Sequence, residues 1–262
     1  GFMARLHQIS EEKSVKFSLL RHYLKKRHVS QDLCIRIRTY LENRWALQQD
    51  VQESNVVVLA LLSENLKAEL ACAIHGPSLT IHPLFYHVQL DQAATMRRLM
   101  LRGVQQMSLA PQDMMFNAGE EGTHMSMIIA GELDYIKMNL KRVLPAIRVN
   151  AHTDWVAEPV LWVNDWHHLG DLKAATFVEI LHIIPLKFLE VVCKNVVSFN
   201  IVSQYAVRYV QWLNEYDKSE VSDITKGEIL YDTLCSLTDC PINPHRISLS
   251  KGGIRPKLWM TR

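Results

Sequence analysis

Seven short apolar runs occupy the middle of the chain and limit what it can fold into. Within two residues, each run is followed by Gly, Pro or Asn, which is the pattern of short strands joined by turns. The runs are residues 105–109, 114–116, 125–129, 133–137, 146–149, 160–163 and 176–184. Several short strands at this spacing predict a small antiparallel β-sandwich or β-roll.

Segments with helical periodicity flank these runs on both sides. Before them, Val15, Leu19 and Tyr23 recur every four residues, and Ser30 is placed to cap a second helix. We expect Gly76-Pro77 to end a further helix and Asp91 to begin another, which extends to about residue 101. After the runs, an apolar stripe from residue 202 to 213 predicts a long helix.

The predicted fold class is therefore α+β. We expect an N-terminal helical linker, an antiparallel, jelly-roll-like β-roll with flanking helices, and a long C-terminal helix that covers the roll as a lid. The 262 residues are 48% hydrophobic and 21% charged, which suits packed domains and argues against wholesale disorder. The net charge of +2 lacks the basic bias of a nucleic-acid-binding protein.

Cysteine and histidine patterns do not predict a metal site. The five Cys are odd in number and scattered, which favours a reducing compartment, and Cys235 and Cys240 lack the paired spacing of a zinc site. Adjacent His167 and His168 point in different directions on a strand or helix. No apolar run approaches the roughly 20 residues that span a bilayer, so we expect a water-soluble region, compatible with a longer membrane protein.

Four stretches together carry a resemblance to a known family. The stretch 31–45 has a polar cap, alternating basic and apolar residues, and ends in Arg44-Trp45. Pro83-Leu84-Phe85 follows, and 111–136 contains Pro-Gln-Asp, Gly119, Gly122 and a Met-x-x-Ile-x-x-Gly-like segment that ends at Gly131. Residues 1–6 are similar to the cytoplasmic end of a last pore helix. Over roughly residues 1–216 the chain resembles the post-pore region of cyclic-nucleotide-gated, hyperpolarisation-activated and plant-type voltage-gated potassium channels.

The resemblance implies an organisation and partners. It implies a helical linker over residues 1–82, a cyclic-nucleotide-binding-like β-roll with its helices over 83–217, and an unassigned extension over 218–262. It also implies self-association as a homo- or heterotetramer through the linker and a membrane pore domain upstream, with the region on the cytoplasmic face of a membrane. Glycines 119, 122 and 131 suit hairpins that need positive φ. The lid helix would turn Tyr209 and Trp212 toward the pocket mouth.

The phosphate-binding stretch departs from the family pattern. The resemblance places it at Ala157, Glu158, Pro159 and Val160, with Glu158 matching the family glutamate that accepts the ribose 2′-OH. Ala157 stands in place of a Gly, and Pro159 removes a backbone N–H that would face the phosphate. The family Arg falls near His167 or His168, followed by Gly170-Asp171, so that Asp171 brings negative charge. A second register, in which Lys173 to Thr176 replaces the Arg-containing stretch, needs a longer insertion.

We therefore predict weak or absent binding of cyclic AMP and cyclic GMP. Loss of an Arg–phosphate pair costs roughly 2–5 kcal/mol, a large share of the roughly 8 kcal/mol of a micromolar ligand. The resemblance thus implies the cytoplasmic gating region of a tetrameric voltage-gated or cyclic-nucleotide-gated-type cation channel, with potassium as the family's commonest ion. No cofactor is certain, and cyclic AMP and cyclic GMP are the doubtful candidates. A soluble cyclic-nucleotide-responsive regulator is the alternative. An enzyme would need an acid/base cluster, which could be drawn from His152, Asp154, Glu158, His167 and His168. The sequence offers no nucleophile, metal motif or Gly-rich nucleotide loop beside them.

Overall fold

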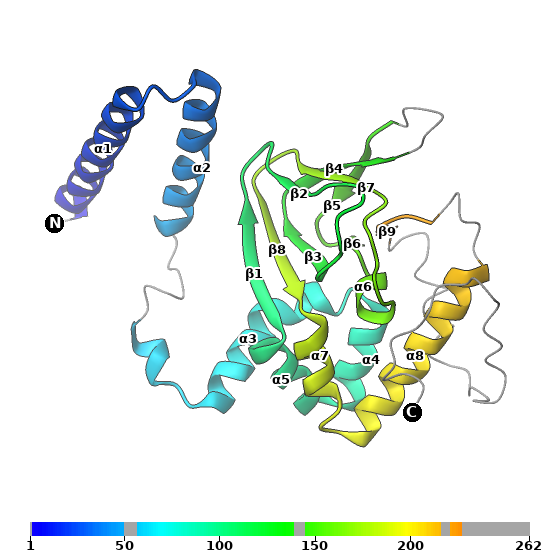
Figure 1. Ribbon diagram of the computed structural model, residues 1–262. Helices are drawn as coiled ribbons and strands as arrows, with labels where there is room; N and C mark the ends of the chain where they lie inside the picture. Colours follow the sequence, from blue (N-terminus) through cyan, green and yellow to red (C-terminus); the bar gives the residue numbers. More distant parts are fainter. Residues whose placement is uncertain (1, 50–56, 139–144, 216–220, 227–262) are drawn as a thin grey trace. The chain divides into compact units, whose positions relative to one another are not determined.

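The computed structural model describes residues 2–49, 57–138, 145–215 and 221–226 (Figure 1). The chain divides into two compact units, Gly1–Val57 and Val58–Arg262. The domain limits that the resemblance implies, after residues 82 and 217, stay predictions. None of the helices within the described residues combines the length and the apolar character needed to cross a lipid bilayer.

The first unit is a pair of helices, as the apolar periodicity predicts. Helix α1 (Phe2–Lys26) and helix α2 (Gln31–Gln49) are joined by a short turn in which His28 has a positive φ of 54°. The edge of the Phe17 ring packs on Trp45, with ring centroids 6.1 Å apart. Leu24 is buried near the turn, so a small apolar contact joins the two helices.

The second unit begins with helices. A 3₁₀ turn (η2, Val57–Leu61) leads to α3 (Glu64–Leu79), α4 (Pro83–Asp91) and α5 (Ala93–Arg102). The expectation that Gly76-Pro77 ends a helix is wrong, because α3 continues to Leu79, where Pro77 costs one N–H in the last turn. Thr80 then bonds Gly76 O through its N–H and its hydroxyl. Asp91 ends α4 and does not begin α5.

Two antiparallel sheets follow (Figure 1). The first sheet has the order β1 (Val104–Leu109), β8 (Val178–Ile183), β3 (Met125–Ala130), β6 (Asp154–Val156) and β9 (Ile224–Lys226). The second has the order β2 (Met114–Phe116), β7 (Gly170–Ala174), β4 (Glu132–Lys137) and β5 (Ile147–Asn150). The α+β class and the antiparallel pairing are thus confirmed.

Six of the seven predicted strand runs contain strands. The seventh, residues 160–163, is wrong, because Pro159–Trp162 forms the short helix α6. Its four residues are all buried, and a short apolar run that is buried on every side has no period to separate strand from helix. Strands β6, β7 and β9 have no matching run. The partner of β9 is β6, 70 residues earlier in the pairing of Trp155 with Thr225.

Gly131 makes the corner between the two sheets. It joins β3 of the first sheet to β4 of the second, with a φ of 85°. A Cβ there would lie 2.1 Å from Phe177 O, so both its conformation and its surroundings require glycine. Gly119 also has positive φ, as predicted, at 83°. Gly122 differs: its φ is not in the left-handed region, and a Cβ would meet Val160 and Trp166 side chains.

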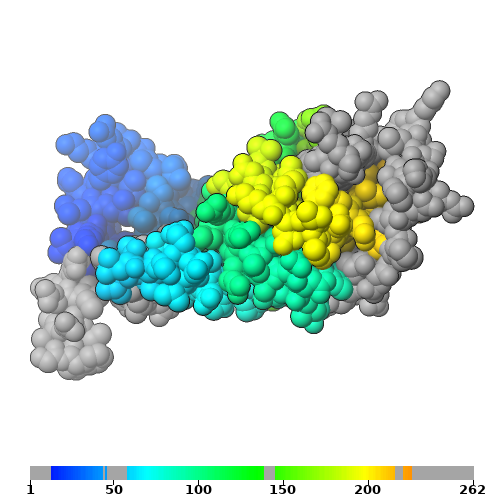
Figure 2. Space-filling model, turned by 90° about the horizontal axis from the view of Figure 1, so that it is seen from below, coloured from blue at the N-terminus to red at the C-terminus, as the bar shows by residue number. Residues whose placement is uncertain are grey.

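Helices α3, α5 and α6 contact strands of the first sheet. Helix α7 (Pro185–Val192) packs on α5, and α8 (Val196–Glu215) packs on α4, α6 and α7. Figure 2 shows α7 and α8, in yellow, beside the segment of α4 and α5 on one face. The predicted long C-terminal helix is confirmed as a helix. Trp155, Trp162 and Phe188 are fully buried where these elements meet.

Candidate functional site

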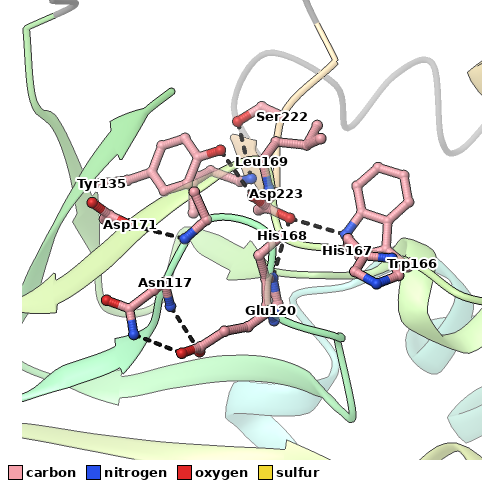
Figure 3. A network of polar contacts seen from close by, with 12 residues as sticks. Asn117, Glu120, Tyr135, Trp166, His167, His168, Leu169, Asp171, Ser222 and Asp223 are labelled. Atoms are coloured by element: carbon pink, nitrogen blue, oxygen red, sulfur yellow. Dashed lines mark hydrogen bonds and ion pairs between the residues drawn. The ribbon is translucent and has the colours of Figure 1, made fainter. Parts of the chain in front are cut away.

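The carboxylate of Asp223 lies buried in a cluster of hydrogen-bond donors beside β7 (Figure 3). Its Oδ1 accepts from Trp166 Nε1 at 2.9 Å and lies 3.2 Å from His168 Nδ1. Its Oδ2 accepts from Tyr135 OH at 2.9 Å and from Leu169 N at 2.6 Å. Four donors around one carboxylate form a site that suits an anion. We call these four donors, from Tyr135, Trp166, His168 and Leu169, the anion cluster.

Hydrogen bonds also hold the backbone of Asp223 and of the strand that follows it. Asp223 O accepts from Ala157 N at 2.7 Å, and β9 pairs with β6 directly afterwards, with Ile224 opposite Val156. Ser222 Oγ accepts from Ile224 N at 3.2 Å and shapes the turn that leads into β9. Residues 221–226 thus extend the first sheet and insert one carboxylate into the unit's interior.

The ring of His168 is oriented by its neighbours. It stacks on Phe116 with centroids 3.6 Å apart and planes 4° apart. Its backbone N–H donates to Glu120 O, and its carbonyl accepts from Gly119 N. Because an ionised carboxylate only accepts hydrogen bonds, the contact with Asp223 requires the proton on Nδ1.

Two tyrosines stay protonated beside this charge. Burial raises the pKa of Tyr135, and the nearby Asp223 carboxylate raises it further. Burial likewise raises the pKa of Tyr209 well above its ordinary value, and Glu158 and Asp223 add to the effect. Both hydroxyls are therefore neutral at physiological pH, and Tyr135 remains a donor to Asp223.

Glu158 forms a second buried cluster, on the side of the helices. Its Oε1 accepts from Tyr205 OH at 2.7 Å and Trp162 Nε1 at 3.2 Å, and its Oε2 accepts from Trp155 Nε1 at 2.7 Å. His82 Nε2 lies 3.1 Å from Oε2. Burial acts to raise the pKa of Glu158, but His82 and the hydrogen bonds outweigh it and hold the pKa below its ordinary value.

His82 connects this cluster to the start of α4. As the N-cap of that helix, its Nδ1 accepts from Leu84 N at 3.2 Å. A ring nitrogen that accepts carries no proton, so the proton sits on Nε2, facing Glu158. Glu158, the predicted acceptor of a ribose hydroxyl, is thus surrounded by protein donors from β6, α6, α8 and the cap of α4.

The other predicted site residues lie in several places. Ala157, Pro159 and Val160 are buried around α6, and Ala157 has a positive φ of 58°, where the family glycine would fit without strain. His168 belongs to the anion cluster, whereas His167 is exposed and its Nδ1 lies 2.9 Å from Asp165 O.

Asp171, predicted to repel a phosphate, does not face the anion cluster. Its Oδ1 accepts from Ala118 N at 2.8 Å, so it holds the loop between β2 and β3. Tyr209 is buried, and its ring lies 6.1 Å from Tyr205 and 5.5 Å from the half-buried Trp212. Tyr209 and Trp212, which the resemblance assigned to a lid, thus pack among aromatic side chains of α6 and α8.

Sequence reasoning missed Asp223, Tyr135 and Trp166. Asp223 lies in the extension that no pattern assigned, and its partners precede it by 54 to 88 residues. Among the described residues, no group of three or more His, Cys, Asp and Glu side chains is placed to hold a metal ion. No protein-family model matches the chain, and no curated protein matches it either. Its function therefore has to be argued from the site.

Proposed function

We propose that this chain is the cytoplasmic gating region of a tetrameric cation channel of the potassium-channel type, regulated without cyclic nucleotide. The observation that carries the proposal is the buried Asp223 carboxylate, which the chain supplies from its own C-terminal extension. On this view the second unit is a jelly-roll-like, cyclic-nucleotide-binding-type β-roll. The segment 221–226 acts as an internal ligand, and α8 acts as the lid.

The chemistry of the site supports this assignment. A phosphate site needs donors and a countercharge, and here Trp166, Leu169 and Tyr135 already donate to a carboxylate. A nucleotide would have to displace Asp223 and leave its charge without partners, at a cost of several kcal/mol, on the order of 3–5. Glu158 is equally engaged, since three neutral donors surround it. The donors around Asp223 and the Glu158 carboxylate, which would contact a nucleotide, are therefore already hydrogen-bonded within the chain.

The first unit supports the tetramer. Val15, Leu19 and Tyr23 form an exposed apolar row on α1, with Leu19 66% exposed. Beside that row, α1 and α2 border a groove lined by Phe17, Leu20 and four basic side chains, Lys13, Arg21, Lys25 and Arg38. Exposed apolar rows of this kind suit a partner surface. We assign this face to a neighbouring copy, whose exposed Leu61, Leu66 and Ile74 on η2 and α3 offer an apolar counterpart.

Calorimetry tests the pocket. We expect no binding heat when cyclic AMP or cyclic GMP is titrated to millimolar concentration into the chain. Micromolar binding that Glu158→Ala abolishes would overturn the self-occupied pocket. Such binding would favour the alternative, a soluble cyclic-nucleotide-responsive regulator.

Recording of ionic current tests the channel. The reading frame that encodes this chain is extended upstream of Gly1 and expressed in oocytes under voltage clamp. We expect cation current, and we expect Asp223→Ala to shift the half-activation voltage, because β9 then loses its anchor. A natural reading frame that adds no membrane-spanning segments upstream would overturn the proposal.

A further inference from the structure

Three side chains with nitrogen or sulfur donor atoms meet at the first sheet, and their hydrogen bonds within the described residues involve neither Asp223 nor Glu158. His182 lies on β8, Met107 on the neighbouring β1, and His124 directly precedes β3 on the other side. His182 Nε2 is 3.1 Å from Met107 Sδ, and the His124 and His182 rings have centroids 3.8 Å apart, inclined by 59°. The register explains the meeting, because His182 pairs with Gln105 and Ser126, and Met107 lies diagonally across.

A hydroxyl group lies within hydrogen-bond distance of Nδ1 in both histidine rings. His182 Nδ1 lies 2.8 Å from Ser126 Oγ, and His124 Nδ1 lies 2.8 Å from Thr123 Oγ1. When each Nδ1 carries the proton and donates to its hydroxyl, each Nε2 presents a lone pair. Such hydrogen bonds to the far nitrogen are the usual way in which metal-binding histidines are oriented.

We propose that Met107, His124 and His182 bind one copper(I) ion. Two imidazoles and a thioether, without a carboxylate, form a soft to borderline donor set, and thioethers select copper(I) over zinc, magnesium or calcium. Met107 is 46% exposed, so the ion can enter from solvent, while His182 is buried behind it. The site is independent of the proposed channel function, since it uses neither Asp223 nor Glu158.

The competing arrangement is an ordinary hydrogen bond without metal. In that case Ser126 donates to His182 Nδ1, and His182 Nε2–H donates to the Met107 sulfur. A metal requires the other tautomer, in which Nε2 has no proton. A metal titration observed at the methionine methyl group separates the two arrangements.

Silver(I), a diamagnetic and air-stable mimic of copper(I), is the first probe. The full chain is labelled with ¹³C at the methyl groups of its ten methionines, and its five cysteines are alkylated beforehand because thiolates bind silver more tightly. We expect one methyl resonance to shift and saturate at one equivalent. Met107→Leu should remove that resonance, which assigns it. Met114→Leu is the matched control, because Met114 is a strand residue with 41% exposure, and it should leave the shift unchanged.

Histidine variants test whether His124 and His182 bind the silver ion together with Met107. We expect His182→Gln and His124→Gln each to raise the silver concentration at half saturation at least tenfold. His124 is only half-buried, so its variant decides the matter if circular dichroism shows that His182→Gln does not fold. An unshifted Met107 methyl, an equal shift at Met114, or saturation unchanged by folded histidine variants would each overturn the site. Anaerobic competition with bicinchoninate then measures copper(I), with Met107→Leu expected to bind at least tenfold more weakly.

Discussion

At the scale of single residues, two buried carboxylates organise the second unit. Asp223 and Glu158 are both fully buried, and each is surrounded by donors from several elements. A buried charge that loses its partners is strongly destabilising, and donors that lose their charge are left unsatisfied. The loss of stability on substituting either carboxylate therefore measures how much its hydrogen-bond cluster stabilises the fold.

Asp223→Ala should lower the free energy of unfolding by about 3–5 kcal/mol, because it leaves Tyr135, Trp166 and Leu169 without an acceptor. Urea denaturation followed by fluorescence measures the change. Asp171→Ala is the matched control. Asp171 is only half-buried and accepts from one backbone N–H, so its loss should cost about 1 kcal/mol. Equal effects of the two variants would contradict the role of Asp223.

The lowered pKa of Glu158 predicts how the stability of the chain changes in acid. Its pKa in the folded chain lies below the ordinary 4.5, so the unfolded chain binds the proton first as pH falls. The stability that Glu158 contributes is complete above pH 4.5 and is lost below it, as pH falls through the folded pKa. Glu158→Gln should flatten this part of a pH series of urea denaturations, while Glu190→Gln, an exposed control, should leave it unchanged. An unaltered slope in Glu158→Gln would contradict the buried ionised state.

At the scale of elements, the fold depends on the turn between two sheets and on a short edge strand. Between β3 and β4 the chain passes from the first sheet to the second through the single residue Gly131. Strand β9 is an edge strand of three residues, so its pairing with β6 depends on the anchor that Asp223 supplies. Short edge strands are weak by themselves because they have few ladder hydrogen bonds.

Gly131→Ala should destabilise the chain by at least about 2 kcal/mol, because φ is positive and the new Cβ would collide with the Phe177 carbonyl. Gly76→Ala is the matched control. Gly76 lies inside α3, and nothing lies within 4 Å of its added Cβ. That change should stabilise by up to about 1 kcal/mol through helix propensity. Thermal denaturation compares them, and opposite shifts in Tm are expected.

At the scale of the whole molecule, the two compact units expose different kinds of surface. Among the side chains of the first unit that the structure describes, only Leu24 is buried, the Phe17–Trp45 ring pair joins the two helices, and the apolar row on α1 is exposed. The second unit has a continuous buried core from α3 to α8. A helix pair with so little core of its own gains stability mainly from a partner surface.

Sedimentation should therefore find tetramers of the chain at tens of micromolar. Leu19→Lys places a charge in the middle of the exposed α1 row and should shift the population to monomers. Leu186→Lys, at a 74% exposed position on α7, is the control and should not change the distribution. A monomeric wild-type chain, or equal dissociation by both variants, would contradict assembly through the first unit.

Local signals in the sequence were enough to determine much of the fold. Alternating and periodic apolar residues predicted six strand runs, the helices at 15–23 and 202–213, and the α+β class. Gly119 and Gly131 predicted positive φ because few other residues adopt it cheaply. The same reasoning failed at residues 160–163 and at Gly76-Pro77. There, burial on every side and position in a last helical turn decided the outcome.

Only the tertiary structure decided which groups surround Glu158 and Asp223. The family resemblance singled out Glu158, but not its partners: Tyr205 lies 47 residues later, and His82 lies at the cap of α4. Asp223 follows a stretch without periodicity. It gains its donors only because β9 pairs with β6 and Leu169, just before β7, lies within hydrogen-bond distance. Hydrogen bonds and ion pairs depend on distance in space, and sequence patterns record mainly which face of an element is buried.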